Sequence, residues 1–361
     1  MTADSKGMDV SVIVAAYNEG AILAENIQRL KAALEARPGV TWELILINDG
    51  SQDDTRAIMD RGMQEDGRVR VHHHWRNFGQ GRALRHGFSM ARGGVVLTWD
   101  ADLSYDPAMI WQLVDTLEEK KVEIAMASPY APGGQVRNVP GLRHFLSRWG
   151  NRYLASMSDY DVHTITCVVR AYRREVLDDM LCSSDGMELQ LEILMKAAIL
   201  NFRVAEVPAE LAWSAKKQAA TQPKRVSKMR IVKTIKTYLQ LGWLFRPSYW
   251  FIVLGMFFLL PGLYMWTWIF YRVFSITLEF LMQGHPINQA ISEGIIVSYT
   301  TYPQTIIVGS TLVLVGLLVW LFSLIFIQNK FYYSELYKQN VNIMKRINQM
   351  KRPDPTCSTN P

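Results

Sequence analysis

The stretch Gly94-Val95-Val96-Leu97-Thr98-Trp99-Asp100-Ala101-Asp102 decides the fold of this chain. Its apolar part predicts a buried strand, and two carboxylates one residue apart follow at the point where that strand ends. Carboxylates in this position are poor material for a core, but they can share a divalent cation. Because Asp-x-Asp occurs by chance in many proteins, the meaning of the triplet depends on the sequence around it.

Strand and helix signals alternate over the first two hundred residues. Apolar runs predict strands at 10–15, 42–47, 69–72 and 95–99, and amphipathic spacing predicts helices at 22–34, 53–63 and 81–90. Strands separated by helices of this length predict an α/β fold with a mostly parallel sheet covered on both faces. Ligands of such sheets bind beyond the carboxyl ends of the strands. Three polar motifs lie there: Tyr17-Asn18-Glu19, Asp49-Gly50-Ser51 and Asp100-Ala101-Asp102.

Longer motifs follow one another in a set order along this region. They are Val12-Ile13-Val14-Ala15-Ala16-Tyr17-Asn18-Glu19, Ile47-Asn48-Asp49-Gly50-Ser51-Gln52-Asp53, Arg76-Asn77-Phe78-Gly79-Gln80-Gly81 and Trp99-Asp100-Ala101-Asp102-Leu103, with weaker matches through Arg170-Ala171-Tyr172-Arg173-Arg174. In this order they resemble the inverting glycosyltransferases of family 2, which have the nucleotide-sugar-binding GT-A (Rossmann-like) fold. More narrowly, the chain resembles the polyprenyl-phosphate hexosyltransferases, the group that includes dolichol-phosphate mannose synthase. Each motif is common, but the ordered set over roughly residues 8–230 is not.

The resemblance implies a binding site for a nucleotide-diphosphate sugar at the strand ends. Tyr17 and Glu19 can flank a base and a ribose, and Asp49 can accept a hydrogen bond from the base. Read alone, Asn48-Asp49-Gly50 is an ordinary turn, with Ser51 or Asp53 as a helix cap; the neighbouring motifs favour binding. The predicted nucleotide-sugar-binding residues are Ala15, Tyr17, Glu19, Asp49, Ser51, Asp100 and Ala101.

A metal site is expected at the same edge. Asp102, together with Asp100, would hold Mg²⁺ or Mn²⁺ on the diphosphate and so make the nucleoside diphosphate a better leaving group. Family members carry a metal-binding Gln two residues after the second Asp, where this chain has Ser104. The predicted metal ligands are therefore Asp100, Asp102 and Ser104.

A further set of residues is expected to bind the acceptor. The family pattern Arg-x-x-x-Ser is matched by Arg143 and Ser147. Guanidinium groups suit bidentate capture of a phosphate, and a solvated basic helix face is the alternative. The predicted acceptor-phosphate residues are Arg143, Ser147, Arg170 and Arg225. Pro129 stands where relatives often have Arg, so one phosphate-binding arginine is missing.

The acceptor also sets the chemistry. A lipid phosphate is already anionic at neutral pH, so positioning and charge neutralisation are expected to outweigh general base catalysis. Asp185 and Glu188 fall where related transferases carry an acidic catalytic motif, and their role stays open. The predicted catalytic residues are Asp102, Asp185 and Arg143.

Two other motifs carry weaker signals. Gly79-Gln80-Gly81 can let a helix N-terminus approach a phosphate, or it can simply turn the chain. His72-His73-His74 invites a metal interpretation, but the alternating faces of a strand separate adjacent side chains, which argues against it. The three cysteines, Cys167, Cys182 and Cys357, have spacings that predict neither a disulfide framework nor a zinc site.

The last third of the chain predicts a membrane anchor. Residues 251–271 and 305–329 carry no charge, and each run exceeds the roughly 20 apolar residues that cross a bilayer; a buried helix of a soluble protein is the alternative. Between residues 224 and 244 apolar residues recur every three or four positions among basic ones, as in a helix lying in the headgroup plane or packed on the catalytic domain. The predicted divisions are a GT-A domain at 1–222, a juxtamembrane amphipathic helix at 223–249, transmembrane helices at 250–273 and 305–328, an extracytoplasmic loop at 274–304 and a basic tail at 329–361.

Charge placement predicts the orientation in the membrane. Residues 211–250 and the tail are rich in Lys and Arg, whereas the segment 274–304 has none. The positive-inside rule therefore places the catalytic domain and both termini in the cytoplasm. The net charge of +6 is accordingly a membrane signature, and no nucleic-acid partner is expected. The sequence leaves a homo-oligomer open.

Together these features predict an integral membrane glycosyltransferase. The resemblance implies inverting transfer of a hexose from a UDP-glucose or GDP-mannose type of donor to polyprenyl (undecaprenyl or dolichyl) phosphate. One alternative is a transferase for another lipid, such as diacylglycerol or ceramide, whose neutral hydroxyl would need a general base. The other alternative is a nucleotide-binding membrane scaffold with little catalysis. Pro129 and Ser104 favour the scaffold, and the intact acidic motifs oppose it.

Overall fold

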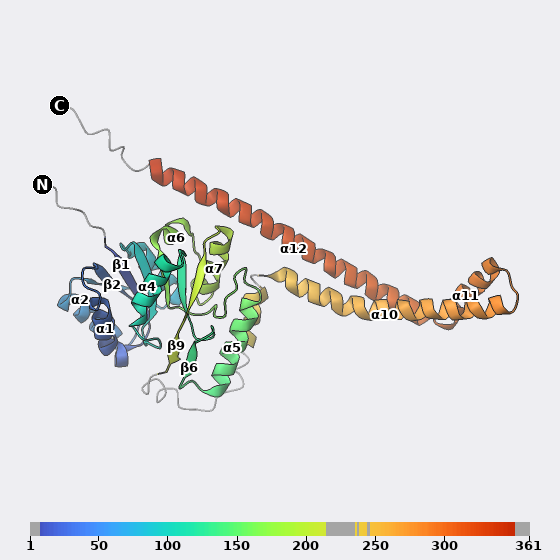
Figure 1. Cartoon of the computed structure of the whole chain (residues 1–361), viewed down its shortest axis with the longest axis horizontal. Helices are drawn as coiled ribbons and strands as arrows, with labels where there is room; N and C mark the ends of the chain where they lie inside the picture. The colour runs from blue at the N-terminus through green and yellow to red at the C-terminus, as the bar shows by residue number, and fades with distance from the viewer. Residues whose placement is uncertain (1–7, 214–234, 237, 244–245, 351–361) are drawn as a thin grey trace. The chain divides into compact units, whose positions relative to one another are not determined.

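The computed structural model describes residues 8–213, 235–236, 238–243 and 246–350 (Figure 1). The chain divides into two compact units, Met1–Leu241 with Tyr337–Pro361, and Gly242–Leu336. The first unit contains the α/β domain and the C-terminal part of the last helix. The second unit contains the long apolar helices of the last third of the chain, up to Leu336.

A seven-stranded sheet with the order β3-β2-β1-β4-β7-β5-β8 forms the centre of the first unit. Neighbouring strands are parallel except at β7, which is antiparallel to both β4 and β5. This confirms the predicted α/β fold: a mixed, mostly parallel, GT-A-like domain. The strands are β1 (Val10–Ala16), β2 (Trp42–Asn48), β3 (Val69–His73), β4 (Val95–Asp100), β5 (Ile124–Ser128), β7 (Arg170–Arg173) and β8 (Val204–Pro208), and a separate two-stranded sheet pairs β6 (Gln135–Arg137) with β9 (Glu210–Ala212).

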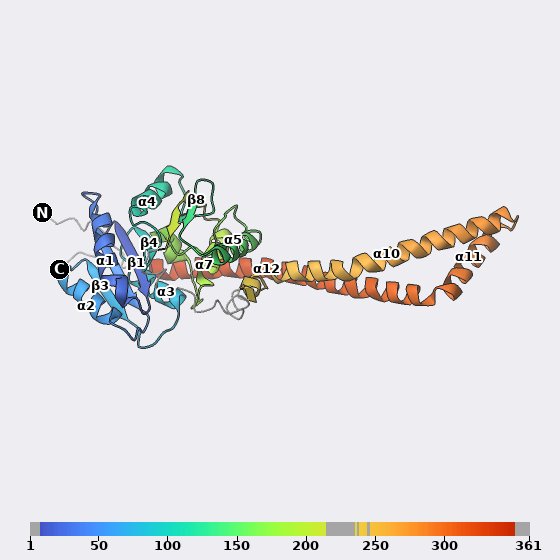
Figure 2. The same cartoon turned by 90° about the horizontal axis from the view of Figure 1, so that it is seen from below.

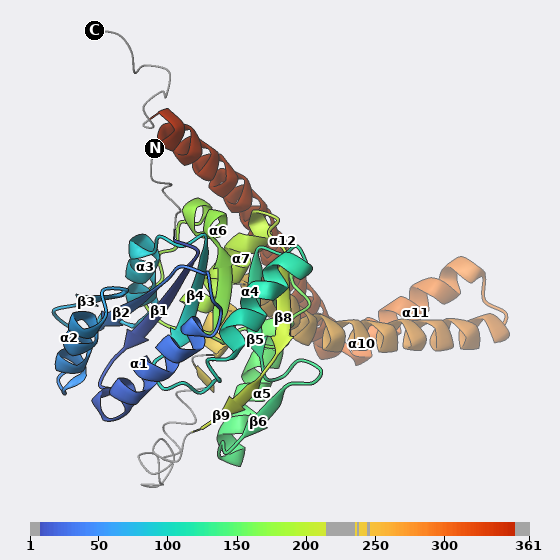
Figure 3. The ribbon, with the colours of Figure 1, turned by 60° about the vertical axis from the view of Figure 1, so that its left-hand side comes forward.

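Helices cover both faces of the sheet (Figure 3). They are α1 (Gly20–Glu35), α2 (Thr55–Glu65), α3 (Gln80–Met90), α4 (Met109–Glu119), α5 (Gly141–Ala155), α6 (Arg174–Asp179) and α7 (Leu189–Ile199). Because strand side chains alternate, β1 sends Val12 and Val14 into a core shared with α1, α2 and α4, whereas Ile13 joins a second core under α3, α6 and α7. Fully burying one such side chain stabilises the fold by roughly 1.5–3 kcal/mol.

The strand register fixes the position of the site. Ala15 pairs with Ile47 on one side and with Asp100 on the other. The carboxyl ends of β1, β2 and β4 therefore lie side by side at one edge, as predicted for a parallel sheet.

The second unit is built from apolar helices. They are α10 (Pro247–Met282), α11 (Ile287–Thr301) and the first part of α12 (Pro303–Met350). The most apolar windows of α10 and α12 have mean hydropathies of 1.8 and 2.6, and only 17% and 11% of those windows is buried, so both helices are long and apolar enough to cross a membrane. Such exposed apolar helices indicate a membrane-associated protein.

Small residues bring α10 and α12 together within this unit (Figures 1 and 2). A Cβ added at Gly262 would lie 2.9 Å from Val313, and one added at Gly316 would lie 3.1 Å from the carbonyl oxygen of Gly255. Glycines at such contacts let two apolar helices approach backbone to backbone, as is common in membranes.

Two segments differ in detail from the expected divisions. The segment 274–304 is mostly helical, because α10 continues to Met282 and α11 follows. Residues 329–350 continue α12 without a break. Most of the expected amphipathic helix at 223–249 lies outside the described residues, although 235–236 and 238–243 are helical.

Candidate active site

The turns after β1 and β2 are tied to each other. Asn18 has a φ of +56°, a left-handed conformation that asparagine tolerates. Its backbone N–H donates to Ser51 Oγ at 3.0 Å, and its side-chain oxygen accepts from the N–H of Gln52 at 2.9 Å. Ser51 and the 17–19 turn are thus held together as one wall.

A cavity of about 320 Å³ opens beside this wall. Tyr17 and Ser51, both predicted to bind the nucleotide, line it together with Arg56, His74, Trp75 and Arg76. Tyr17 and Trp75 are 44% and 79% exposed, so aromatic faces are available for stacking on a base. The sequence analysis gave no binding role to Trp75 or to Arg76, although Arg76 is the first residue of the motif Arg76-Asn77-Phe78-Gly79-Gln80-Gly81 and Trp75 precedes it.

Asp49 lies behind this cavity and is almost fully buried, with 3% exposure. Its carboxylate accepts hydrogen bonds from the N–H groups of Phe78 and Gly79, at 3.0 and 2.8 Å, and lies 2.8 Å from His74 Nδ1. What the structure shows is therefore a carboxylate that positions the loop 74–79. A direct contact between Asp49 and a base stays a prediction.

The Asp100-Ala101-Asp102 turn is held from several sides. Asp102 Oδ1 accepts from both the N–H and the hydroxyl of Ser104, at 3.0 and 2.7 Å. The Asn26 amide donates to the carbonyl of Ala101 at 2.8 Å, and Leu103 adopts a φ of +46°. Ser104 is 5% exposed and orients Asp102; its predicted role as a direct ligand is untested.

The donor set at this turn fits a hard divalent cation. Asp100 and Asp102 are both partly exposed carboxylates at the end of β4. Mg²⁺ and Mn²⁺ prefer such oxygen ligands, and Mg²⁺ is commonly held by one or two carboxylates plus substrate phosphates.

A buried thiol and phenol stand next to Asp100. Burial raises the pKa of Cys167 to about 12, and the charge of Asp100 adds to that effect. Tyr105 is also buried, and its pKa is raised by burial and by the nearby Cys167 and Asp100. Cys167 is therefore a neutral thiol at physiological pH and is not a nucleophile.

The acidic loop before α7 packs on the start of α3. A Cβ at Gly81 would lie 2.6 Å from the carbonyl oxygen of Gly186, and one at Gly79 would overlap the carbonyl of Asp185. This contact explains the Gly79-Gln80-Gly81 motif, because only glycine lets the two backbones approach so closely. The Asp185 carboxylate forms an ion pair with Arg85, and the Glu188 carboxylate accepts from the N–H of Gly186 at 3.0 Å. A catalytic role for Asp185 remains a prediction.

Arg143 and Ser147 lie one turn apart on α5, so they share a face of that helix. Arg143 is exposed, and its guanidinium carbon lies 5.1 Å from the ring centre of Trp213. Ser147 hydrogen-bonds with Tyr130, whose pKa is raised because burial outweighs that bond. The pair is placed as the motif predicts, and phosphate binding by it stays a prediction.

Arg170, in contrast, is a correction. It is 0% exposed, and its guanidinium donates to the carbonyls of Cys167, Gln190 and Ile165 at 2.9, 2.9 and 2.6 Å. This side chain ties the segment 165–167 to the start of α7 and presents nothing to a lipid phosphate. Arg225, the other distant member of the predicted acceptor set, lies outside the described residues.

An apolar ridge on α5 was missed from the sequence. Leu142, Phe145 and Trp149 are 47%, 66% and 38% exposed. Their spacing of three and four residues places them along one side of the helix, beside Arg143 and the exposed Arg148. The three- and four-residue spacing of these apolar residues is visible in the sequence, where it is interleaved with the arginines.

This chain is similar to several known proteins. The profile of glycosyl transferase family 2 matches residues 11–181. A polyprenol monophosphomannose synthase of Mycolicibacterium smegmatis is 35% identical over 204 residues, which are 55% of this chain and 75% of that relative. An undecaprenyl-phosphate 4-deoxy-4-formamido-L-arabinose transferase of Shewanella sediminis is 34% identical over 173 residues, 48% of this chain and half of that relative. Among solved structures, a glucosyl-3-phosphoglycerate synthase of Mycobacterium tuberculosis is 18% identical and superposes with a TM-score of 0.47. The superposition covers 64% of this chain and 80% of the synthase chain.

The family 2 profile and the 35% identity to the mannose synthase define the protein as an enzyme that transfers a sugar. The chain belongs to glycosyltransferase family 2.

Proposed function

We propose that this enzyme transfers one hexose from a nucleotide-diphosphate sugar to a polyprenyl phosphate at a membrane surface, with inversion at the anomeric carbon. The observation that carries the proposal is α5, where the exposed Arg143 adjoins the exposed apolar ridge Leu142, Phe145 and Trp149. A lipid phosphate needs both features, a cation for its head and an apolar surface for its chain. The names of the two sequence relatives point to the same class of acceptor.

The donor is held at the strand ends. The base stacks against Tyr17 and Trp75, which line the 320 Å³ cavity together with Ser51. Glu19, at the N-terminal end of α1, is expected to lie toward the ribose. Asp49 keeps the loop 74–79 in place as the cavity wall. Asp100 and Asp102 would hold a Mg²⁺ or Mn²⁺ ion, which neutralises the diphosphate when bound.

The reaction then needs little proton transfer. Arg143, with Ser147, holds the phosphate so that one of its oxygens attacks the anomeric carbon from the side opposite the leaving group. The glycosidic bond to the diphosphate breaks, and the nucleoside diphosphate leaves with the electron pair. Because the attacking oxygen is already anionic, orientation supplies most of the rate.

The anchor sets the location of this chemistry. Exposed apolar helices and basic flanks support a membrane protein whose GT-A domain (1–222), tail (329–361) and both termini face the cytoplasm, with 274–304 outside. Tags at Met1 and Pro361 should be accessible only from the cytoplasmic side, and a tag near His285 only from the other side. The opposite labelling would contradict this topology.

The reaction has a direct test. Purified enzyme in detergent is incubated with labelled UDP-glucose, GDP-mannose or UDP-N-acetylhexosamine, polyprenyl phosphate and Mg²⁺ or Mn²⁺. One donor should give a labelled, organic-soluble and acid-labile product, and the same assay identifies the base and the sugar. Transfer to diacylglycerol or ceramide, with none to polyprenyl phosphate, would contradict the proposal.

A further inference from the structure

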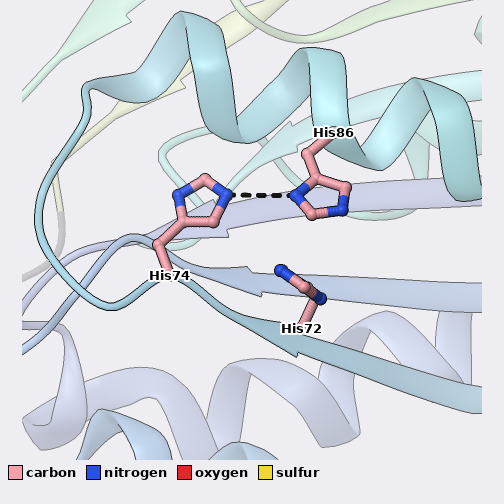
Figure 4. A group of neighbouring side chains, drawn as sticks. All are labelled: His72, His74 and His86. Atoms are coloured by element: carbon pink, nitrogen blue, oxygen red, sulfur yellow. Dashed lines mark hydrogen bonds between the residues drawn. The ribbon is translucent and has the colours of Figure 1, made fainter.

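Three histidines converge beside the end of β3 (Figure 4). His72 lies in β3, His74 directly follows that strand, and His86 lies in α3. His72 and His74 point to the same face because side chains two apart along an extended chain do so. His86 reaches them from α3, which packs on β1 and β2. One nitrogen from each of the three imidazoles lies within 4.8 Å of the other two.

The third member of the tripeptide points elsewhere. His73 Nε2 lies 2.8 Å from Asp60, and its Nδ1 lies 3.1 Å from the Asn48 amide. His73 is therefore separated from its two neighbours, as the alternating faces of a strand predict. The sequence pattern could not include His86, which is brought in only by the fold.

We propose that His72, His74 and His86 form a binding site for a transition-metal ion of the Zn²⁺ class. Zn–N bonds of about 2.0–2.1 Å at tetrahedral angles place two ligand nitrogens roughly 3.3 Å apart. His74 Nε2 and His86 Nδ1 are already 3.2 Å apart, and the ring centres of His72 and His86 are separated by 3.9 Å. A side-chain rotation of His72 completes the triangle.

The group behind His74 suits this role. Asp49 accepts from His74 Nδ1 at 2.8 Å, and this bond leaves the Nε2 lone pair directed at His86 and the proposed ion. Carboxylates bonded to the far nitrogen of a metal-binding histidine fix its tautomer and raise its basicity. Asp49 is itself held by the N–H groups of Phe78 and Gly79. The imidazole of His74 is therefore held in the orientation that a metal ligand needs.

The remaining surroundings favour neutral imidazoles. Burial, and then the neighbouring histidines, lower the pKa of His72 and of His86. Arg82 adds positive charge near His86, and Asp49 supplies the opposing negative charge at His74. His86 also lines an open cavity of about 450 Å³, which gives an ion and a water a path to the site.

The donor atoms separate this site from the one at Asp100 and Asp102. Three imidazole nitrogens suit Zn²⁺, Co²⁺, Ni²⁺ or Cu²⁺, whereas the two carboxylates suit Mg²⁺ or Mn²⁺. A water would occupy the fourth position of a tetrahedral ion. The proposal does not depend on the sugar-transfer reaction.

Metal binding by the full-length enzyme tests the proposal. Protein without a polyhistidine tag is purified in detergent and stripped with a chelator, and Zn²⁺ affinity is measured by competition with a chromogenic chelator. Co²⁺ is titrated in parallel, because tetrahedral Co²⁺ absorbs in the visible range. Wild type should bind one Zn²⁺ tightly in the presence of excess Mg²⁺, and His72→Ala and His86→Ala should each weaken binding on the order of tenfold to a hundredfold or more.

His73→Ala is the matched control, since it removes a histidine from the same tripeptide but not from the cluster. It should bind Zn²⁺ as wild type does, as should Asp102→Asn. Zn²⁺ should raise the thermal unfolding midpoint of wild type and not that of His86→Gln, a milder variant that guards against misfolding of His86→Ala. Equal Zn²⁺ affinity in wild type and both His86 variants, or equal losses in His73→Ala, would overturn the proposal.

Discussion

The donor edge of the sheet and helix α5 are built in different ways. At the donor edge the key carboxylates are held by hydrogen bonds: the buried Asp49 to the loop 74–79, and the partly exposed Asp102 to Ser104. On α5, Arg143 and the ridge residues Phe145 and Trp149 are exposed. A preorganised edge suits a soluble donor, whereas an open amphipathic helix suits a partner that the membrane supplies.

The largest expected effect falls on the donor edge. Asp102→Asn keeps the shape of the side chain and removes its charge, so turnover should fall on the order of a hundredfold or more. Asp106→Asn is the matched control. Asp106 is an exposed acid four residues after Asp102, and its side chain accepts a hydrogen bond from the N–H of Ala108. Steady-state rates and thermal unfolding midpoints of both variants check this. Near-normal turnover of Asp102→Asn with chelator present would remove Asp102 from the metal site.

A smaller effect is expected on α5. Loss of a charge-assisted contact to a phosphate costs roughly 1.5–3 kcal/mol, so Arg143→Ala should lower the use of polyprenyl phosphate by about tenfold or more. Arg143→Lys should recover only part of the rate, since an ammonium cannot form the bidentate contact. Arg152→Ala, which removes an exposed arginine further along the same helix, should change little. Equal losses in the Arg143 and Arg152 variants would reduce the role of α5 to general basic charge.

A still smaller effect is expected at the acidic loop. General base catalysis contributes about 10²–10⁴-fold where it is used, and a phosphate acceptor does not need it. The predicted catalytic role of Asp185 is therefore needed only for a neutral acceptor, and with a phosphate acceptor Asp185→Asn should reduce the rate by well under about tenfold. The rate with saturating substrates is the measurement. A loss of about a hundredfold or more would favour a neutral hydroxyl acceptor.

The smallest effect concerns stability near that loop. Burial alone would raise the pKa of Glu192, but bonds from Lys196, Ser184 and Ser183 outweigh it and lower the pKa to about 2. A carboxyl whose pKa is lower in the folded state stabilises the fold above its unfolded pKa of about 4.3 and loses that contribution as pH falls toward 2. The unfolding midpoint of Glu192→Gln should lie below that of wild type at pH 7, and the gap should shrink at pH 3. Glu119→Gln, which changes an exposed acid, should unfold at the same midpoint as wild type at both pH values. A difference for Glu192→Gln that grows as the pH falls would contradict the lowered pKa of Glu192.

The donor edge could be predicted from the sequence because its signals are local. Apolar runs predicted β1, β2, β3 and β4 to within one or two residues, and parallel pairing then brings their polar ends together. Asp100, Asp102, Tyr17 and Ser51 consequently lie where the motifs placed them.

Other features could not be predicted because they depend on contacts between distant segments. Arg170 matches a motif, but three carbonyls from the core take up its guanidinium. His86 joins His72 and His74 only when α3 packs on the sheet. The need for glycine at position 81 comes from the loop at Gly186, which packs against it in the folded chain.

One crossed measurement tests most directly whether the donor and the acceptor are bound by separate regions of the enzyme. Nucleotide affinity and the dependence of transfer on polyprenyl-phosphate concentration are measured in detergent for wild type, Asp102→Asn and Arg143→Ala. Arg143→Ala should keep the nucleotide affinity of wild type and require a much higher polyprenyl-phosphate concentration for transfer. Asp102→Asn should bind the metal–nucleotide complex more weakly and transfer more slowly, with the lipid dependence of wild type. Loss of nucleotide binding in Arg143→Ala, with its lipid dependence unchanged, would contradict the account.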